Sequence, residues 1–245
     1  MKIALLGTGK MGKAIAAKAL EAGHQIVLQI NEMNLQDLTT QNLKKADVAI
    51  EFTRPDAVLG NLNKCLEAGV PVVCGTTGWH DSFEEVRRQF IAAEGALFSA
   101  TNFSIGVNLL FQLNRELAKW MNDFPSYQPD LEEVHHTHKL DKPSGTAVTL
   151  AQGITEQYTS IKNWKLAEEG QQPSANELRI TSIREDEVIG IHEVCWTSTI
   201  DKISIRHEAF NREGFVNGAL IAAEWLIGKT GVFGMNDLLF SKQKL

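Results

Sequence analysis

The sequence has few cysteines and no long hydrophobic run. Its 245 residues include three cysteines (Cys65, Cys74 and Cys195) with no closely spaced pair. An odd count without a CxxC motif argues against a disulfide framework and favours reduced thiols in a cytoplasmic protein. No apolar run is long enough to cross a bilayer, and the first residues predict a strand, not a signal peptide. We therefore expect a cytoplasmic protein with no membrane partner.

Positive charge is also scarce. Lys and Arg total 24 against 30 Asp and Glu, a formal net charge of −6. Such a chain lacks the electrostatic footprint of a nucleic-acid-binding protein, so no nucleic-acid partner is expected. Hydrophobic residues make up 43% of the chain, which is ordinary globular composition and allows one large domain or two modest ones.

A glycine-rich turn near the N-terminus has the pattern of a dinucleotide-binding site. The apolar run Lys2–Leu6 predicts a buried strand, a helical pattern follows the turn, and Gln25–Ile30 predicts a second strand. In this context one glycine makes a tight turn, one lets a pyrophosphate approach the backbone, and one lets helix and strand pack closely. The turn fits GxGxxG with Gly7, Thr8, Gly9, Lys10, Met11 and Gly12.

The second strand of such a fold usually ends in an acid that holds the adenosine ribose. Here it ends Ile30-Asn31-Glu32. Glu32 lies at about the expected separation, but Asn31 is an alternative occupant of that place, and an amide would tolerate a 2′-phosphate better than a carboxylate. Lys10 could add positive charge near a phosphate. The cofactor is therefore NADH or NADPH, and the sequence leaves the choice open.

Strands and helices continue to alternate, which predicts a parallel, doubly wound sheet. Further strands are expected at 47–52, 70–74 and 96–99, and helices at 53–67, 81–93 and 107–121. Ligands of such sheets bind at the carboxyl ends of the strands. Two of these ends carry small, hydroxyl-rich loops that either let a flat ring lie close to the backbone or are merely tight turns. Their residues are Gly75, Thr76 and Thr77 in one loop, and Ala100, Thr101, Asn102 and Phe103 in the other.

The second half predicts an α+β domain. A linker at 122–129 leads to a strand at 130–136, a helix at 145–158, a polar loop at 159–177, and strands at 178–184, 187–196 and 199–207. Consecutive strands with short turns predict an antiparallel sheet, whose open edges or face an oligomer would cover. An apolar helix at 215–227 leads to 231–239, which returns to the first domain. The expected organisation is a Rossmann domain (1–104 and 215–245) and a domain with a mixed or antiparallel sheet (105–214).

Residues 132–147, EEVHHTHKLDKPSGTA, concentrate groups that exchange protons and bind anions. His135, His136, His138 and Lys139 fall within five positions, and Ser144-Gly145-Thr146 follows as a predicted helix start. Imidazole exchanges protons near neutral pH, and the first turn of a helix attracts a carboxylate. The stretch favours an anionic substrate that needs a proton. A zinc site from the three histidines is an alternative, but no cysteine is near and Lys139 would compete by charge, so no metal is predicted.

In this order the motifs resemble those of the dihydrodipicolinate reductases of bacterial lysine biosynthesis, also called 4-hydroxy-tetrahydrodipicolinate reductases. The resemblance runs from Lys2 to about Leu239, is to the compact branch of the family, and is most diagnostic in E-x-HH-x-x-K-x-D-x-PSGTA from Glu133 to Ala147. It implies a Rossmann domain and a second domain that binds substrate and forms an oligomer, usually a homotetramer. It also implies reduction of a cyclic imine dicarboxylate with NADH or NADPH.

The resemblance implies residue roles as well. His135 is similar to the family's proton donor or acceptor, and Lys139 to its proton donor. Substrate ligands are implied at His136, Gly145, Thr146 and Arg212, and cofactor contacts at 7–12, 75–77 and 100–103. Two positions depart from the family: Asn31 stands in place of an acid, and Ile191 stands where many members have the Glu of G-E-H.

Two other functions fit the residues. One is a Rossmann dehydrogenase of another small imino or keto acid, which substrate profiling would identify. The other is a non-catalytic dinucleotide sensor that has kept the fold. The sensor would bind NAD(P)H and turn over no imine, and the intact HHTHK stretch argues against it.

Overall fold

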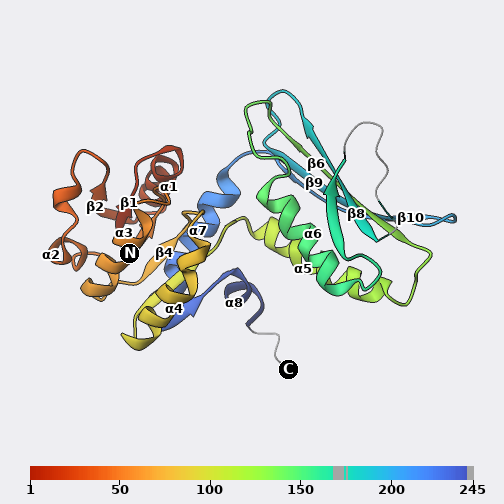
Figure 1. The fold of residues 1–245 in the computed structure, drawn as a ribbon. Coiled ribbons are helices and arrows are strands. Elements are labelled where there is room, and N and C mark those ends of the chain that lie inside the picture. The colour runs from red at the N-terminus through yellow and green to blue at the C-terminus, as the bar shows by residue number, and fades with distance from the viewer. Residues whose placement is uncertain (168–173, 175, 242–245) are drawn as a thin grey trace. The chain divides into compact units, whose positions relative to one another are not determined.

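The computed structural model describes residues 1–167, 174 and 176–241 (Figure 1). It divides into two compact units: Met1–Ile105 with Glu213–Leu245 (unit 1), and Gly106–Arg212 (unit 2). The predicted fold class is confirmed, because unit 1 holds a six-stranded parallel sheet and unit 2 a five-stranded mixed sheet. In the part of the chain that the structure describes, no helix is long and apolar enough to cross a membrane.

The sheet of unit 1 has the strand order β11-β5-β4-β3-β1-β2. Its strands are β1 (Lys2–Leu6), β2 (Gln25–Ile30), β3 (Val48–Glu51), β4 (Val72–Cys74), β5 (Ala96–Ser99) and β11 (Gly231–Phe233). The helices of this unit are α1 (Lys10–Glu21), α2 (Thr40–Leu43), α3 (Val58–Ala68), α4 (Phe83–Ala92), α7 (Glu213–Leu226) and α8 (Met235–Phe240), with short 3₁₀ turns η1 (Leu35–Asp37) and η2 (His80–Ser82). After α7, β11 pairs in parallel with β5 at the edge of this sheet.

Helices cover both faces of this sheet because its strands are apolar on both sides. Successive side chains of a strand point to opposite faces. Ile3 and Leu5 pack in one cluster with residues of α1 and α7. Ala4 and Leu6 pack in a second cluster with residues of α3 and α4. The near-continuous apolar runs of the sequence are thus explained by burial on both faces.

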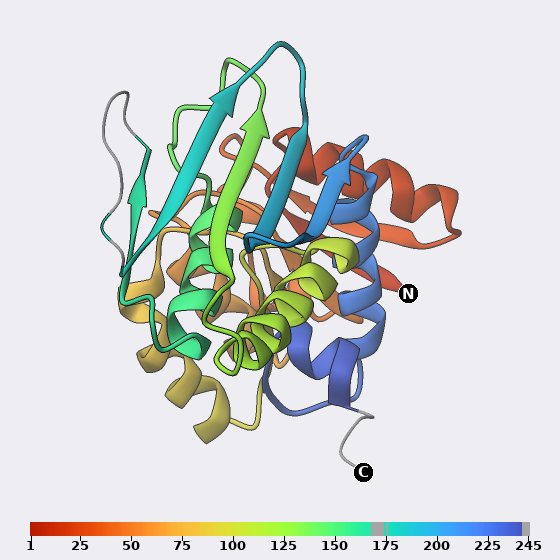
Figure 2. The same ribbon diagram turned by 90° about the vertical axis from the view of Figure 1, so that its right-hand side faces the viewer.

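Unit 2 places β6 (Gln128–His135) at the centre of a sheet ordered β10-β9-β6-β8-β7 (Figure 2). The other strands are β7 (Asn163–Leu166), β8 (Glu177–Arg184), β9 (Gly190–Thr197) and β10 (Lys202–Ala209). Helices α5 (Ile105–Met121) and α6 (Gly145–Gln157) supply the apolar residues that bury one face of this sheet. Because β6 alternates, Leu131, Glu133 and His135 all point to that buried face.

The purely antiparallel alternative for the second sheet is wrong. β6 inserts between β8 and β9, and it pairs in parallel with β8 and antiparallel with β9. The predicted polar loop at 159–177 is also wrong in part, because it contains β7, an edge strand parallel to β8. Three of the four side chains of β7 are exposed, so no alternation marks the strand in the sequence. Residues 168–173 and 175 of this predicted loop lie outside the described residues.

Several element boundaries differ by a few residues from expectation. The helix predicted from residue 53 begins at Val58, because the Arg54 carbonyl accepts hydrogen bonds from the Ala57 and Val58 amides and forms a turn first. Pro55 therefore lies before the helix and not in its first turn. The predicted linker at 122–129 is shorter, since β6 begins at Gln128.

The three fingerprint glycines occupy different environments. Gly7 has φ of 101°, in the region that favours glycine, and a Cβ there would overlap the Phe52 carbonyl. A Cβ at Gly12 would overlap the Gly7 carbonyl oxygen, whereas one at Gly9 would meet no atom within 4 Å. The turn, the open backbone position and the close helix–strand packing expected of the fingerprint are thus all present.

We predict that Gly12→Ala lowers the free energy of unfolding by about 1–3 kcal/mol, because the added methyl must displace backbone. Gly9→Ala is the matched control and should change the free energy by less than about 0.5 kcal/mol. Urea unfolding of both variants measures the difference. Equal stability of the two variants would contradict the packing described for Gly12.

Candidate active site

The candidate nucleotide-binding residues all follow the carboxyl ends of strands in unit 1. Gly7 follows β1, Asn31 follows β2, Gly75 follows β4 and Ala100 follows β5. Because the strands are parallel, these ends lie at one edge of the sheet. The topology therefore brings together segments that are distant in sequence.

The turn before α1 fits the pyrophosphate of a dinucleotide. Gly9 is the N-cap of α1 and is exposed, and the space beside its α-carbon is open. The first amides of a helix point outward without intrahelical partners and attract anions. Exposed Lys10 begins the helix and adds positive charge there, while Thr8 and Met11 are partly exposed.

Asn31 and Glu32 differ in what they contact. The Asn31 side-chain oxygen accepts a hydrogen bond from the Met33 amide at 2.8 Å, so it stabilises the turn after β2. Glu32 is exposed and forms an ion pair with Arg54, with 2.7 Å between Oε1 and Nη1. Arg54 comes from the turn after β3, so an acid and a base lie together at this corner of the sheet.

In the two hydroxyl-rich loops, some residues stabilise the fold and others are candidates for contact with a ligand. Thr76 is buried, and its hydroxyl accepts a hydrogen bond from the Thr53 amide at 2.8 Å, which joins neighbouring loops. Phe103 is buried against Phe52 and Phe98 and belongs to the core. Gly75 and Ala100 are partly exposed, as is Asn102, and Thr77 and Thr101 are exposed, so these residues remain the candidates for ligand contact.

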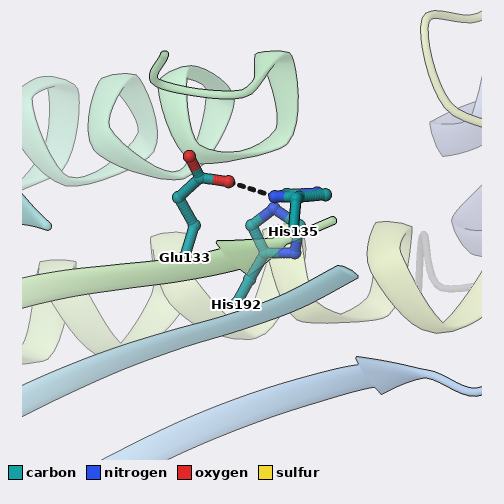
Figure 3. A group of neighbouring side chains, drawn as sticks. All are labelled: Glu133, His135 and His192. Carbon is teal, nitrogen blue, oxygen red and sulfur yellow. Dashed lines mark ion pairs between the residues drawn. The ribbon is translucent and has the colours of Figure 1, made fainter. Parts of the chain in front are cut away.

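In unit 2 a buried cluster forms around His135, the last residue of β6. The His135 Nδ1 atom forms an ion pair with a carboxylate oxygen of Glu133, two residues earlier on the same face (Figure 3). His192 on β9 lies opposite Glu133 in the strand register, and its ring is 5.0 Å from that of His135. Glu133, His135 and His192 are buried, with 0%, 7% and 4% of each residue exposed, so water does not screen their side chains.

Arg184 completes the surroundings of Glu133. It is the last residue of β8, opposite His135, and its Nη1 atom lies 3.0 Å from the second carboxylate oxygen of Glu133. Burial raises the pKa of the Glu133 carboxyl, but hydrogen bonds and charge from neighbours that include His135 and Arg184 outweigh burial and lower it to about 2. Glu133 is therefore a buried anion between two cationic groups when His135 is protonated.

Gly190 at the start of β9 makes room for the His135 ring. A Cβ at Gly190 would lie 3.0 Å from His135 Nε2 and 3.3 Å from Cδ2. The ring is thus confined between Glu133 on its Nδ1 side and the Gly190 backbone near Nε2. A histidine held in this way has a fixed orientation.

His192 links this cluster to the start of α6. Its Nε2 atom is 3.0 Å from the hydroxyl oxygen of Ser144, which is the N-cap of α6 and accepts a hydrogen bond from the Ala147 amide. Burial, reinforced by the nearby His135, lowers the pKa of His192 to about 3, so this ring is neutral near neutral pH. Gly145 follows, is exposed, and has open space beside its α-carbon. An anion at this helix start would meet Gly145 and Thr146 first.

The remaining residues of the stretch lie in a loop. β6 ends at His135, so His136 and His138 do not share a strand face, and their rings are 6.3 Å apart. Lys139 is partly buried, and its ammonium lies 2.8 Å from an oxygen of Asp141. Burial raises the pKa of Asp141, but the hydrogen bond and charge of Lys139 outweigh it and leave that pKa lowered.

Ile191 and Arg212, which the sequence analysis singled out, lie respectively away from the His135 cluster and in an exposed segment. Ile191 pairs with Val134, and by strand alternation it points to the face opposite His192 and Glu133. The family's Glu at this position would therefore also point away from the cluster. Arg212 lies in an exposed bend after β10, where the chain passes from unit 2 to unit 1, and its substrate role stays a prediction.

A metal site requires several donor atoms close together. Among the described residues, this is found for Glu133, His135 and His192, whose donor atoms lie within 4.8 Å of one another. The three neighbouring histidines of the sequence do not form this set. Glu133 already contacts the guanidinium of Arg184, and a second cation beside it would be repelled. The donor set fits a hydrogen-bonded ion cluster better than a metal centre.

The sequence analysis assigned no role to Glu133, His192 or Arg184. The position of Glu133 could have been predicted from the sequence, because Glu133 and His135 are two residues apart on a strand and so share a face. The position of Arg184 could not, since its contact depends on the parallel pairing of β6 with β8 across about fifty residues.

We predict that acid destabilises the protein through His192. Its pKa is about 3 when folded, against about 6.5 in an unfolded chain, so the unfolded state binds more protons between these values. The free energy of unfolding should fall by up to about 1.4 kcal/mol per pH unit below about pH 6.5 from this group alone. Urea unfolding at several pH values should show a shallower pH dependence for His192→Gln. His80→Gln, at an exposed site, is the control, and an unchanged slope in His192→Gln would contradict the assignment.

The matches to known proteins cover nearly the whole chain. Residues 1–103 match the family described as "Dihydrodipicolinate reductase, N-terminus", and residues 106–239 match "Dihydrodipicolinate reductase, C-terminus". A protein of Christiangramia forsetii named 4-hydroxy-tetrahydrodipicolinate reductase is 44% identical over 241 residues and covers 98% of both chains. One of the same name from Pelagibacter ubique is 36% identical over 96% of this chain and 92% of its own length.

Solved structures agree at the level of the fold. A dipicolinate-bound dihydrodipicolinate reductase from Paenisporosarcina sp. TG-14 superposes with a TM-score of 0.79 at 23% identity, covering 98% of this chain and 99% of that one. An amine dehydrogenase from Mycobacterium smegmatis reaches a TM-score of 0.60 at 12% identity, over 95% of this chain and 94% of that one. Since both halves match one family and relatives of that family align over nearly the full length, the chain belongs to the dihydrodipicolinate reductase family.

Proposed function

We propose that this chain reduces 4-hydroxy-tetrahydrodipicolinate to tetrahydrodipicolinate with a nicotinamide dinucleotide, a step of lysine and diaminopimelate biosynthesis. The observation that carries the proposal is the match to relatives bearing that name over 98% and 96% of this chain. The structural relative holds dipicolinate, a cyclic dicarboxylate, which supports the class of substrate. The polar cluster of unit 2 suits an anion that must receive a proton.

The candidate residues divide by unit. The glycine-rich turn and the strand-end loops of unit 1 hold the dinucleotide, which supplies the hydride when bound. His135, Lys139 and the start of α6 in unit 2 hold the cyclic substrate. Orienting the two reactants contributes much of the rate of such a reaction.

Proton delivery falls to His135 and Lys139. Hydride addition to a carbon conjugated with the C=N bond moves electron density to nitrogen, which then needs a proton. His135 keeps Nδ1 on Glu133, so its Nε2 is the atom left to exchange a proton. Lys139 is 24% exposed at its side chain and pairs with Asp141, so it offers a more accessible proton. General acid catalysis of this kind adds about 10²–10⁴-fold.

The substrate's carboxylates are assigned to positive groups around the start of α6. Gly145 and Thr146 offer the first amides of the helix, where the dipole favours an anion. His136 and Arg212 are assigned to the same substrate. The assembly is proposed to be a cytoplasmic homotetramer, which light scattering of the purified protein would test.

The direct test is a steady-state assay of reduced nicotinamide consumption. The substrate is made in situ by condensing pyruvate with aspartate semialdehyde, and NADH and NADPH are run in parallel. Oxidation that depends on this substrate supports the reductase. If the protein bound the cofactor but turned over only another small imino or keto acid, it would be a related dehydrogenase. If it bound the cofactor and turned over no substrate, it would be a sensor.

We predict that His135→Gln and Lys139→Ala each lower kcat by about 10²-fold or more, because each removes a proton-transfer group. The Kd for the reduced nucleotide, measured by fluorescence, should stay within about twofold of wild type, since the nucleotide residues are in unit 1. His80→Gln and Lys142→Ala are matched controls at exposed positions. Near-native kcat in both test variants would remove these residues from the mechanism.

A second prediction concerns nucleotide choice. We assign the ribose hydroxyls to Glu32, because the Asn31 oxygen is already used in its turn, and a 2′-phosphate to Arg54. Arg54→Ala should weaken NADPH binding about tenfold relative to NADH, and Glu32→Ala should weaken NADH relative to NADPH. Calorimetric titration of both nucleotides measures the ratio.

Arg87→Ala is the matched control for this pair. Arg87 is exposed on α4, where it pairs with Glu84 in the same helix, so its loss should leave the nucleotide ratio unchanged. If Arg54→Ala and Arg87→Ala gave the same ratio, Arg54 would not be the phosphate ligand.

A further inference from the structure

Arg184 of unit 2 makes four polar contacts, and no sequence motif points to a role for it. Its side chain is 9% exposed. A guanidinium has five N–H donors in a fixed planar fork and no acceptor, so burying it requires several well-placed oxygens. The contacts of Arg184 meet this requirement at one end of the sheet.

One side of the guanidinium faces the His135 cluster. Nη1 lies 3.0 Å from Glu133 Oε1, while the other oxygen of Glu133 contacts His135. The same Nη1 donates to the Ile183 carbonyl at 2.7 Å, which fixes the plane of the group. Arg184 therefore determines which way the Glu133 carboxylate is turned, and Glu133 in turn orients the imidazole.

The other side of the guanidinium faces the loop that carries Lys139. Nε donates to the Lys139 carbonyl at 3.2 Å, and Nη2 donates to the Asp141 carbonyl at 2.6 Å. These carbonyls flank the Lys139–Asp141 ion pair. Residues 136–144 form neither helix nor strand, so single hydrogen bonds locate this loop. The Thr137 amide donates to the Asp186 carbonyl near its start, and the two bonds from Arg184 hold its middle.

We infer that Arg184 is a positioning residue that fixes both proton-transfer candidates at once, His135 through Glu133 and Lys139 through the loop backbone. The inference rests on the proposed function for its chemical meaning. The structural part of the inference is that one guanidinium holds both the loop and the Glu133 carboxylate in place, and all of these residues are in unit 2.

A lysine cannot replace this arrangement. It would keep a positive charge beside Glu133, but an ammonium lacks the planar fork that reaches two loop carbonyls and a carboxylate together. Misplacement of a reacting group by about 1 Å costs on the order of 10²-fold in rate. Arg184→Lys therefore separates charge from geometry.

The test compares Arg184→Lys and Arg184→Ala with Arg179→Ala, an exposed arginine on the same strand. We expect kcat to fall by about 10–10²-fold in both Arg184 variants, with the nucleotide KM within about twofold of wild type. Added guanidinium ion should restore part of the kcat of Arg184→Ala and none of that of Lys139→Ala. Arg179→Ala should behave as wild type.

Hydrogen exchange supplies a readout that does not depend on turnover. Amides of residues 136–144 should exchange faster in both Arg184 variants, while amides of β9 keep their protection. Folded Arg184 variants with near-native kcat, or with unchanged exchange in this loop, would overturn the inference. If Arg184→Ala does not fold, Arg184→Lys decides. If the wild-type protein showed no turnover, the proposed function would be rejected. The hydrogen-exchange result would still decide whether Arg184 positions the loop.

Discussion

The buried carboxylate of Glu133 is the constraint on which the polar end of unit 2 depends. An unpaired charge at 0% exposure would cost several kcal/mol, on the order found for buried ions in proteins, so it requires cationic partners with good geometry. Arg184 provides one from the adjacent parallel strand β8, and the His135 ring contacts the other carboxylate oxygen. Glu133 thereby connects two parts of the site, because His135 is a proton-transfer candidate and Arg184 binds the neighbouring loop.

This dependence explains why the strand register matters to chemistry. His135 and Arg184 are register partners at the ends of β6 and β8, and Glu133 and His192 are partners across β6 and β9. A shift of one residue on any of the three strands would turn a polar side chain to the other face of the sheet. Apolar residues on the same strands, such as Leu131, Ile180 and Val194, pack in one cluster with residues of α6 and set that register. Core packing thus places the charges.

Much of the molecule could be predicted because the relevant interactions are local. The alternation of strands and helices, the glycine turn and the return of the chain to unit 1 all follow from residues close in sequence. The insertion of β6 between β8 and β9 could not be predicted in this way, since strand order is set by packing between distant segments. For the same reason Arg184 could not be found. β7 was missed because its side chains are mostly exposed and show no period.

The charges around His135 are paired without an acid at position 191. Ile191 points away from the cluster, and the nearby charged groups pair among themselves: Glu133 with Arg184, and Lys139 with Asp141. Buried His192 is neutral near neutral pH and contributes a hydrogen bond to Ser144 in place of charge. Each of these pairs is neutral as a whole. The surroundings of His135 are therefore set by the positions of Glu133, Arg184 and His192 on three neighbouring strands and not by an excess of charge of either sign.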